Sequence, residues 1–182
     1  MLNKDFILCL SGHSSLQLRT ISKLDIENLR TWKNSKKGTC FLNEDISPRQ
    51  QEKWYGLFSN QEHDYMFIVE QNIGEEWKEI GCMGFRKLEK EGCIDAYNII
   101  RAQKIEPAFF TMGDAFCIML AYAASLFDKL PVQSKVLITN PAVEWYQKNN
   151  FSIVSTVSNY YLMELNKAGL KKYDWLIKND KK

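Results

Sequence analysis

The 182-residue sequence predicts a single domain of the α/β (α+β) class. Three observations support this fold class. The composition, with 45% hydrophobic and 25% charged residues, is that of an ordinary globular protein. Three consecutive extended segments occupy the middle of the chain. A later segment is apolar on nearly every side at helical spacing, as expected for a helix buried against a sheet.

The N-terminal part begins with a strand and two helices. Residues 16–21 alternate apolar and polar side chains, which predicts a half-buried strand. Ser22 precedes apolar residues at helical spacing and is expected to cap a first helix. Ser47 followed by Pro48 is typical of a helix start, and the following pattern predicts a second helix over residues 48–58.

Three antiparallel strands are predicted next, followed by helix, strand, helix and two strands. The three strands form a meander with turn signals around Gly74 and Gly92. The buried helix covers residues 113–127, and a short strand covers residues 135–140. Asn140 then caps the next helix, and the last two strands follow it.

The final segment is predicted to be separate from the domain of residues 1–166. Residues 167–182 contain six lysines and two aspartates, with apolar side chains such as Leu170 and Ile177 at helical spacing. We expect a basic amphipathic C-terminal helix, which either lies on the domain surface or contacts a partner or a membrane surface.

Charge and hydropathy exclude several classes of protein. A net charge of +2 provides no electrostatic reason to expect nucleic-acid binding. The longest mostly apolar run, residues 115–127, is shorter than the roughly 20 residues of a membrane span. Residues 6–10 are too few for the apolar region of a secretory signal, which needs about 7–15 residues. We expect a cytoplasmic protein that binds a small molecule or another protein.

The cysteines favour neither disulfides nor a metal site. They are odd in number and far apart, no CxxC pair occurs, and the chain has only two histidines. We therefore expect buried free thiols and no metal cofactor. The five positions are Cys9, Cys40, Cys82, Cys93 and Cys117.

Residues 105–116 are the first candidate binding segment. A strand ends, a proline intervenes, and Gly113 and Ala115 open the buried helix. Small residues let a ligand approach the N–H groups of the helix start, and the helix dipole favours an anion such as a pyrophosphate there. Helix packing without any ligand is the alternative explanation of these small residues.

Residues 140–151 are the second candidate segment. Trp145 and Tyr146 lie on one side of the predicted helix, and Asn150 precedes a new strand at Phe151. Taken alone, an aromatic residue at such a position belongs to the core by default. The two segments together, however, form a pattern.

That pattern resembles the GCN5-related N-acetyltransferase (GNAT) superfamily. The family's V-x-P before an R/Q-x-x-G-x-G/A loop is similar to Ile105 and Pro107 before residues 110–115. The family's N-x-A-x-x-(Y/F)-Y-x-x-x-(G/N)-F is similar to Asn140, Ala142, Trp145, Tyr146, Asn150 and Phe151. The resemblance covers roughly residues 16–165, includes the element order, and implies a central, mixed, mostly antiparallel sheet of six to seven strands flanked by helices.

The resemblance implies acetyl-CoA as the acetyl donor and direct transfer to a primary amine in a ternary complex. Ile105 is implied in pantetheine binding and Asn140 in a further cofactor contact. Tyr146 matches the position of the acid that protonates the leaving thiolate. The implied pyrophosphate site is the loop and helix start of Phe110, Thr111, Met112, Gly113, Asp114 and Ala115.

This loop departs from the family pattern at three positions. Phe110 replaces the usual Arg or Gln, and Met112 stands where a basic residue is usual. Asp114 adds a negative charge near the expected pyrophosphate, although backbone amides can bind phosphate without side-chain help. A weak-binding or catalytically degenerate member, acting as a binding module, is therefore an alternative.

The attacking amine must lose a proton, and Asp95 is the candidate acceptor. It lies inside a strand pattern, where a bare carboxylate is costly unless it is solvated or used. An aspartate on the solvent face of the strand is the alternative explanation. Glu70 is a second candidate base.

The candidate substrate-binding residues are Trp32, Asn34 and Tyr97. The segment around Trp32 and the late aromatic strand look like those of N-acetyltransferases for nucleotide-linked amino sugars, of the pseudaminic acid pathway type. Ribosomal-protein alanine acetyltransferases share the early tryptophan and asparagine, so a protein N-terminal acetyltransferase is the alternative. The resemblance also allows a homodimer.

Overall fold

The computed structural model describes residues 4–11, 15–39, 41, 44–74, 76–104, 110–169 and 175–179. Within this part of the chain, nine strands form one sheet with the order β7-β8-β6-β5-β4-β3-β2-β1-β9. The strands are β1 (Phe6–Leu10), β2 (Leu16–Thr20), β3 (Asp64–Ile73), β4 (Glu76–Leu88), β5 (Cys93–Arg101), β6 (Val132–Leu137), β7 (Phe151–Val157), β8 (Tyr160–Leu165) and β9 (Trp175–Asn179). The helices are α1 (Ile26–Ser35), α2 (Pro48–Phe58), α3 (Met112–Leu126) and α4 (Ala142–Lys148).

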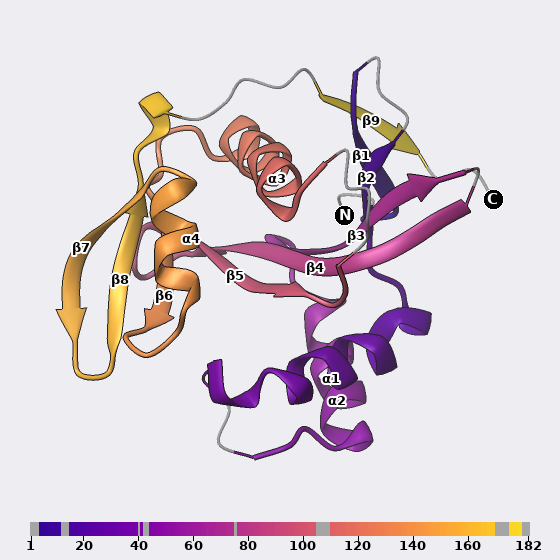
Figure 1. Ribbon diagram of the computed structural model, residues 1–182, viewed down its shortest axis with the longest axis horizontal. Coiled ribbons are helices and arrows are strands. Elements are labelled where there is room, and N and C mark those ends of the chain that lie inside the picture. Colours follow the sequence, from indigo (N-terminus) through magenta and orange to yellow (C-terminus); the bar gives the residue numbers. More distant parts are fainter. Residues whose placement is uncertain are drawn as a thin grey trace.

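Helices cover both faces of the sheet, as the predicted α/β class requires (Figure 1). On one face, Phe116 of α3 packs against Trp145 of α4 and Phe151 of β7, with ring centroids 5.1 and 5.6 Å away. On the other face, Leu29 of α1 and Phe58 of α2 join a second apolar cluster. The fold class is confirmed, and the described sheet has nine strands, two or three more than the six or seven expected.

Local capping signals place the helix starts. The second helix begins at Pro48 and ends at Phe58, as predicted. Ser47 Oγ accepts the Gln50 N–H at 3.3 Å, and the Gln50 side chain accepts the Ser47 N–H at 2.7 Å. This reciprocal pair satisfies two donors at the helix start. Ser22 is also a cap, but of a short 3-10 turn that precedes α1.

The prediction of a C-terminal helix is wrong for residues 175–179. They form β9, which pairs antiparallel with β1, and Leu8 lies opposite Ile177. The N–H and C=O groups on the outer side of β1 need partners, and β9 supplies them at this edge of the sheet. Residues 170–174 and 180–182 lie outside the described residues.

The sheet divides between β5 and β6. These strands are parallel, and they pair only where Ile94 faces Val132 and Asp95 faces Gln133. Beyond these positions β5 continues to Arg101 and β6 to Leu137, and the two strands separate (Figure 1). The ladder therefore opens in the middle of the sheet.

Two sequence-based expectations concern thiols and membrane spans. Within the described residues, Cys9, Cys82, Cys93 and Cys117 are buried and form no disulfide, as their spacing predicts. Cys40 lies outside the described residues. No helix in the described ranges is long and apolar enough to cross a membrane.

Gly81→Ala is expected to lower the free energy of unfolding by about 2–3 kcal/mol, because overpacking forces backbone to move. A Cβ on Gly81 would lie 2.2 Å from the Ile100 carbonyl oxygen on β5. Gly56→Ala is the matched control: nothing lies within 4 Å of its Cβ position in α2, so alanine is expected to stabilise the helix slightly. Urea denaturation measures both, and equal stabilities would contradict the packing argument.

Candidate active site

A cleft of about 550 Å³ lies where β5 and β6 separate. Residues of β5, including Asp95 and Tyr97, line one side, and Ser134 and Lys135 of β6 line the other. Tyr146 of α4 also lines the cleft. The divergence of two parallel strands therefore creates space inside the sheet layer and brings side chains from distant parts of the chain to it.

Tyr146 is held by a buried hydroxyl. Ser134 Oγ lies 3.1 Å from the Tyr146 phenol oxygen and 2.9 Å from the Ala96 carbonyl oxygen. The Tyr146 ring packs edge-on against Phe116 and Phe151. The phenol group thus has a defined position at the wall of the cleft, with apolar rings behind it.

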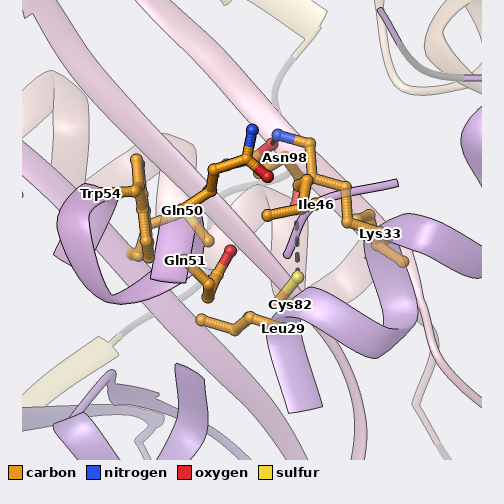
Figure 2. Close-up of a pocket in the computed structure, with 10 residues that line it drawn as sticks. Leu29, Lys33, Ile46, Gln50, Gln51, Trp54, Cys82 and Asn98 are labelled. Carbon is orange, nitrogen blue, oxygen red and sulfur yellow. Dashed lines mark hydrogen bonds between the residues drawn. The ribbon is translucent and has the colours of Figure 1, made fainter. Parts of the chain in front are cut away.

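A smaller recess of about 130 Å³ adjoins the cleft between the α1–α2 pair and the sheet (Figure 2). Lys33, Trp54, Asn98 and Ile100 line both spaces, so the recess and the cleft are continuous. Gln50, Gln51 and the edge of Trp54 surround the recess together with apolar side chains. A ligand with both polar and apolar groups would find partners here.

A β-bulge shapes the shared wall. Cys82 faces Ile100 and Gly84 faces Tyr97, so two β5 residues oppose one β4 residue between these pairs. Asn98 in the bulge has a φ of 51°, and its side-chain oxygen accepts a hydrogen bond from Lys33 Nζ at 3.0 Å. A bulge takes its extra residue out of the ladder, which re-aims backbone groups beside the cleft.

Asp95 is buried and paired, not solvated. Its carboxylate accepts hydrogen bonds from Arg86 Nε and Nη2 at 3.0 and 2.9 Å. Burial lowers the pKa of Arg86, but the facing Asp95 carboxylate outweighs it and the pKa is raised. The Arg86 guanidinium also lies 4.7 Å from the centre of the Tyr97 ring.

The Tyr97 hydroxyl donates a hydrogen bond to Asp64 at the start of β3. Burial, followed by the nearby Asp64 carboxylate, raises the pKa of Tyr97 well above its usual value, so the phenol stays neutral at physiological pH. Burial also raises the pKa of Asp64, although Tyr97 and Arg86 oppose that change. Tyr97 therefore presents mainly its ring to the cleft.

The charge of the cleft is positive. Among its described lining residues, Lys33, Arg86 and Lys135 carry positive charge and Asp95 carries the single negative charge, which Arg86 already pairs. Lys135 Nζ lies 5.9 Å from the centre of the Tyr160 ring, at the same wall. The field in the cleft favours an anionic ligand.

The start of α3 carries its own carboxylate. Asp114 Oδ2 accepts hydrogen bonds from the Thr111 N–H and from Thr111 Oγ1, both at 2.8 Å, and Thr111 Oγ1 accepts the Asp114 N–H in return. The N–H groups of Met112 and Gly113 lie in the first turn, before any intrahelical acceptor exists. These amides fit an anion, although Asp114 opposes a second negative charge close by.

Packing also favours a small residue at position 113. A Cβ there would lie 3.0 Å from Asn149 Oδ1, at the C-terminal end of α4. Thr111, Gly113, Asp114, Lys148 and Asn149 line a hollow of about 150 Å³ that connects the start of α3 to the end of α4. The contact with Asn149 therefore supports packing as the reason for a small residue at position 113, and the hollow supports the approach of a ligand.

The structure gathers four of the candidate residues in one cleft: Asp95, Tyr97, Asn140 and Tyr146. The Asn140 side chain is already engaged, because its oxygen accepts the Ala142 N–H at 2.8 Å and its nitrogen donates to the Thr39 carbonyl at 2.7 Å. Asn140 precedes α4, whose N-cap is Pro141, and it ties this turn to Thr39 in the 3-10 turn that follows α1. Its contact with a cofactor stays a prediction.

The candidate residues of the loop before α3 and of the start of α3 lie beside two different spaces. Thr111, Gly113 and Asp114 line the hollow at the start of α3, whereas Ala115 is fully buried. Phe110 and Met112 line a different, small space of about 10 Å³, which Thr111 also borders. Ile105 lies outside the described residues.

Two candidate substrate residues lie away from the cleft lining. Trp32 packs against the apolar cluster beneath α1 and α2. The Asn34 side chain bonds both the N–H and the carbonyl of Ile46, which lines the recess, so Asn34 shapes the recess indirectly. Glu70, the second candidate base, bonds Gln17 and Arg19 on β2.

Sequence reasoning missed Lys33, Arg86, Ser134 and Lys135. One signal was available for Ser134, since residues 132, 134 and 136 form the inward, buried side of β6 and a serine interrupts two valines there. For Arg86 the signal is positional, because its strand neighbour across the meander is Asp95.

Comparisons with known proteins identify the fold. No family model matches the sequence, and no curated protein matches it. A domain from Methanocaldococcus jannaschii DSM 2661 is similar in structure, with a TM-score of 0.71 and 12% identity, over 84% of this chain and 99% of that one. FdhC, a nucleotide-linked sugar GNAT, has a TM-score of 0.67 and 16% identity, over 85% of this chain and 88% of its own.

A third similar structure is the spermidine N-acetyltransferase from Vibrio cholerae in complex with CoA and spermine. Its TM-score is 0.66 and its identity 16%, over 91% of this chain and 96% of that one. The chain therefore has the fold of the GCN5-related N-acetyltransferases, as the sequence resemblance implied.

Arg86→Gln is expected to lower the free energy of unfolding by about 1–2 kcal/mol, because it leaves the mostly buried Asp95 carboxylate without its partner. Arg86→Gln combined with Asp95→Asn is expected to cost less than Arg86→Gln alone. Lys37→Gln, which breaks the exposed pair with Asp45, is the control and should change little. Strictly additive effects in urea denaturation would show that the Arg86–Asp95 pair contributes nothing.

Proposed function

We propose that the protein is an acetyl-CoA-dependent N-acetyltransferase whose acceptor is a primary amine on an anionic small molecule, a nucleotide-linked amino sugar. The observation that carries this proposal is the cleft between β5 and β6. The chain has a GNAT fold, and this cleft opens where the ladder between β5 and β6 ends. Tyr146, which matches the tyrosine of the family pattern, lines the cleft, and the charges of its lining residues make its field positive.

The residues present fit acetyl-CoA, which supplies an activated acetyl thioester when bound. First-turn amides of α3, at Met112 and Gly113, would hold phosphate oxygens, with Lys148 as the nearby cation in the same hollow. The space between β5 and β6 would admit the pantetheine arm. Asp114 opposes phosphate binding, so we expect weaker affinity than a loop with a basic residue would provide.

This chain's own residues contribute orientation and proton transfer. Tyr146 supplies a proton from its Oη to the thiolate that leaves. The bulge at Asn98 directs backbone groups toward the cleft, where an N–H can stabilise negative charge on the carbonyl oxygen under attack. Asp95 is held by Arg86, which makes it an orienting group in the cleft wall, and the amine proton passes to solvent.

The charges of the cleft favour the sugar nucleotide over a polyamine. A nucleotide-linked sugar carries a diphosphate, which Lys33 and Lys135 attract, whereas spermine and spermidine are polycations that the same field repels. The amide groups of Gln50 and Gln51 beside the Trp54 ring are suited to hydroxyl groups on an apolar ring face. The described residues that line the cleft form no acidic groove that would attract a cationic protein N-terminus.

A binding module with the GNAT fold and no catalysis is the second candidate. The observation that favours it is the Asp114 carboxylate, which accepts both donors of Thr111 and so occupies the helix start from within the chain. The two candidates differ in whether the protein binds acetyl-CoA.

Acetyl-CoA at 100 times its dissociation constant is expected to stabilise the native state by about 2.7 kcal/mol. A thermal denaturation series with increasing acetyl-CoA measures this as an upward shift of the melting temperature. Asp114→Asn retains a hydrogen-bond acceptor and removes the charge, so its shift should be larger at equal ligand concentration. No shift at millimolar acetyl-CoA in either protein would favour the binding module.

Lys135→Gln is expected to raise the KM for a nucleotide-linked amino sugar about 5- to 10-fold with little change in kcat, because a cation beside the diphosphate is lost. The increase should shrink in high salt. Lys129→Gln, in the exposed turn after α3, is the control for net charge. If spermidine is the better acceptor, or if the KM for the nucleotide-linked amino sugar does not rise in Lys135→Gln, the anionic-acceptor assignment is wrong.

A further inference from the structure

Ser134 is a polar residue in an apolar row. The inward side of β6 consists of Val132, Ser134 and Val136, all of them buried. A buried hydroxyl costs free energy unless it is hydrogen-bonded, so its partners explain its position. Those partners are the carbonyl of Ala96 on β5 and the phenol of Tyr146 on α4.

The Ala96 carbonyl lies next to the last ladder pair of β5 and β6, which joins Asp95 to Gln133. Because the strands separate here, Ser134 supplies the hydrogen bond that a continuing ladder would otherwise provide. One side chain therefore closes the end of the ladder and contacts the Tyr146 phenol.

A serine hydroxyl has one proton and can accept two hydrogen bonds. When Ser134 donates to Ala96, whose carbonyl only accepts, the Tyr146 phenol can donate to Ser134 Oγ. When the Ser134 hydroxyl rotates, it donates to the Tyr146 oxygen instead. The two distances, 2.9 and 3.1 Å, allow both arrangements without movement of the backbone.

We propose that Ser134 is a positioning residue for Tyr146: it orients the phenol in the resting state and turns its own hydroxyl from Ala96 to the phenolate oxygen once Tyr146 has given up its proton. This rests on the proposed acetyltransferase function. In the reaction, the amine nitrogen forms the C–N bond and the C–S bond breaks. The thiolate sulfur takes the Tyr146 proton, and the proton released by the amine restores the phenol through solvent.

On β6, Ser134 is the polar residue that contacts the Tyr146 hydroxyl. Phe116 on α3 and Phe151 on β7 face the ring with apolar groups. The charged groups that share the cleft are Lys33, Arg86, Asp95 and Lys135, and the other titratable groups there are Tyr97 and Tyr160. Substitution of Ser134 leaves all of them in place, so a change at Tyr146 reports the hydroxyl.

The kinetic test compares Ser134→Ala with wild type. We expect kcat to fall about tenfold, the KM for acetyl-CoA to stay within about twofold, and the alkaline limb of the kcat–pH profile to move to higher pH, since the phenolate loses a donor. Ser134→Thr retains the hydroxyl and should restore most of the rate. Thr20→Val removes another buried hydroxyl that joins two strands, β1 and β2, away from the cleft, and should leave kcat unchanged.

The same variants in a Tyr146→Phe background separate positioning from general damage. If Ser134 acts through Tyr146, then Ser134→Ala lowers kcat in the wild type and has no further effect in Tyr146→Phe. An equal fold-loss in both backgrounds would overturn the proposal. Ser134→Cys fills the volume with a weak donor, so it serves as the substitute where Ser134→Ala does not fold.

A titration of the unliganded protein provides a readout that needs no turnover. Tyrosine labelled with ¹³C at Cζ, with the Tyr146 resonance assigned from Tyr146→Phe, reports ionisation of the phenol. We expect its midpoint to lie about one pH unit higher in Ser134→Ala than in wild type or Ser134→Thr. Equal midpoints would overturn the proposal. A protein that shows this difference and transfers acetyl to no amine would retain the Ser134–Tyr146 coupling and refute the proposed function instead.

Discussion

The early end of the β5–β6 ladder is the constraint on which the site depends. Two residue pairs join these strands, and beyond them the backbone groups of both strands must find other partners or meet solvent. Ser134 satisfies one of these groups, the Ala96 carbonyl. The same divergence opens the cleft and allows Tyr146, on the helix after β6, to reach it. The cleft, the place of Tyr146 beside it and the Ser134–Ala96 hydrogen bond therefore share one structural cause.

A row of charged residues runs across the strands beside this opening. In register, Asp64 on β3 lies opposite Arg86 on β4, and Arg86 lies opposite Asp95 on β5. A cation between two carboxylates reduces the free-energy cost of burying all three groups. The Tyr97 hydroxyl also donates a hydrogen bond to the Asp64 carboxylate. Because Asp95 is neutralised within the protein, Lys33 and Lys135 determine the sign of the field that a ligand meets.

The sequence motifs pointed to residues that the structure places at the cleft, but they did not point to the charged partners of those residues. Asn140 and Tyr146 lie in one short segment whose spacing is visible in the chain, and the structure brings both to the cleft with Asp95 and Tyr97. Arg86 reaches Asp95 only through strand register, and Lys33 reaches Asn98 from a helix 65 residues away in sequence. Pairings of this kind depend on geometry between distant segments, which no local pattern encodes.

The sequence by itself determined the elements that local chemistry controls: the capped start of α2, the buried helix α3, and the order of strands and helices from residue 16 to 165. Tertiary structure decided the secondary structure of the C-terminal segment. Its apolar spacing suits a helix, but its residues 175–179 form a strand that pairs with β1. Tertiary structure also decided which polar groups meet in the cleft. The physical reason is the same in both cases, since an unpaired strand edge and a buried charge are satisfied only by whatever the fold places beside them.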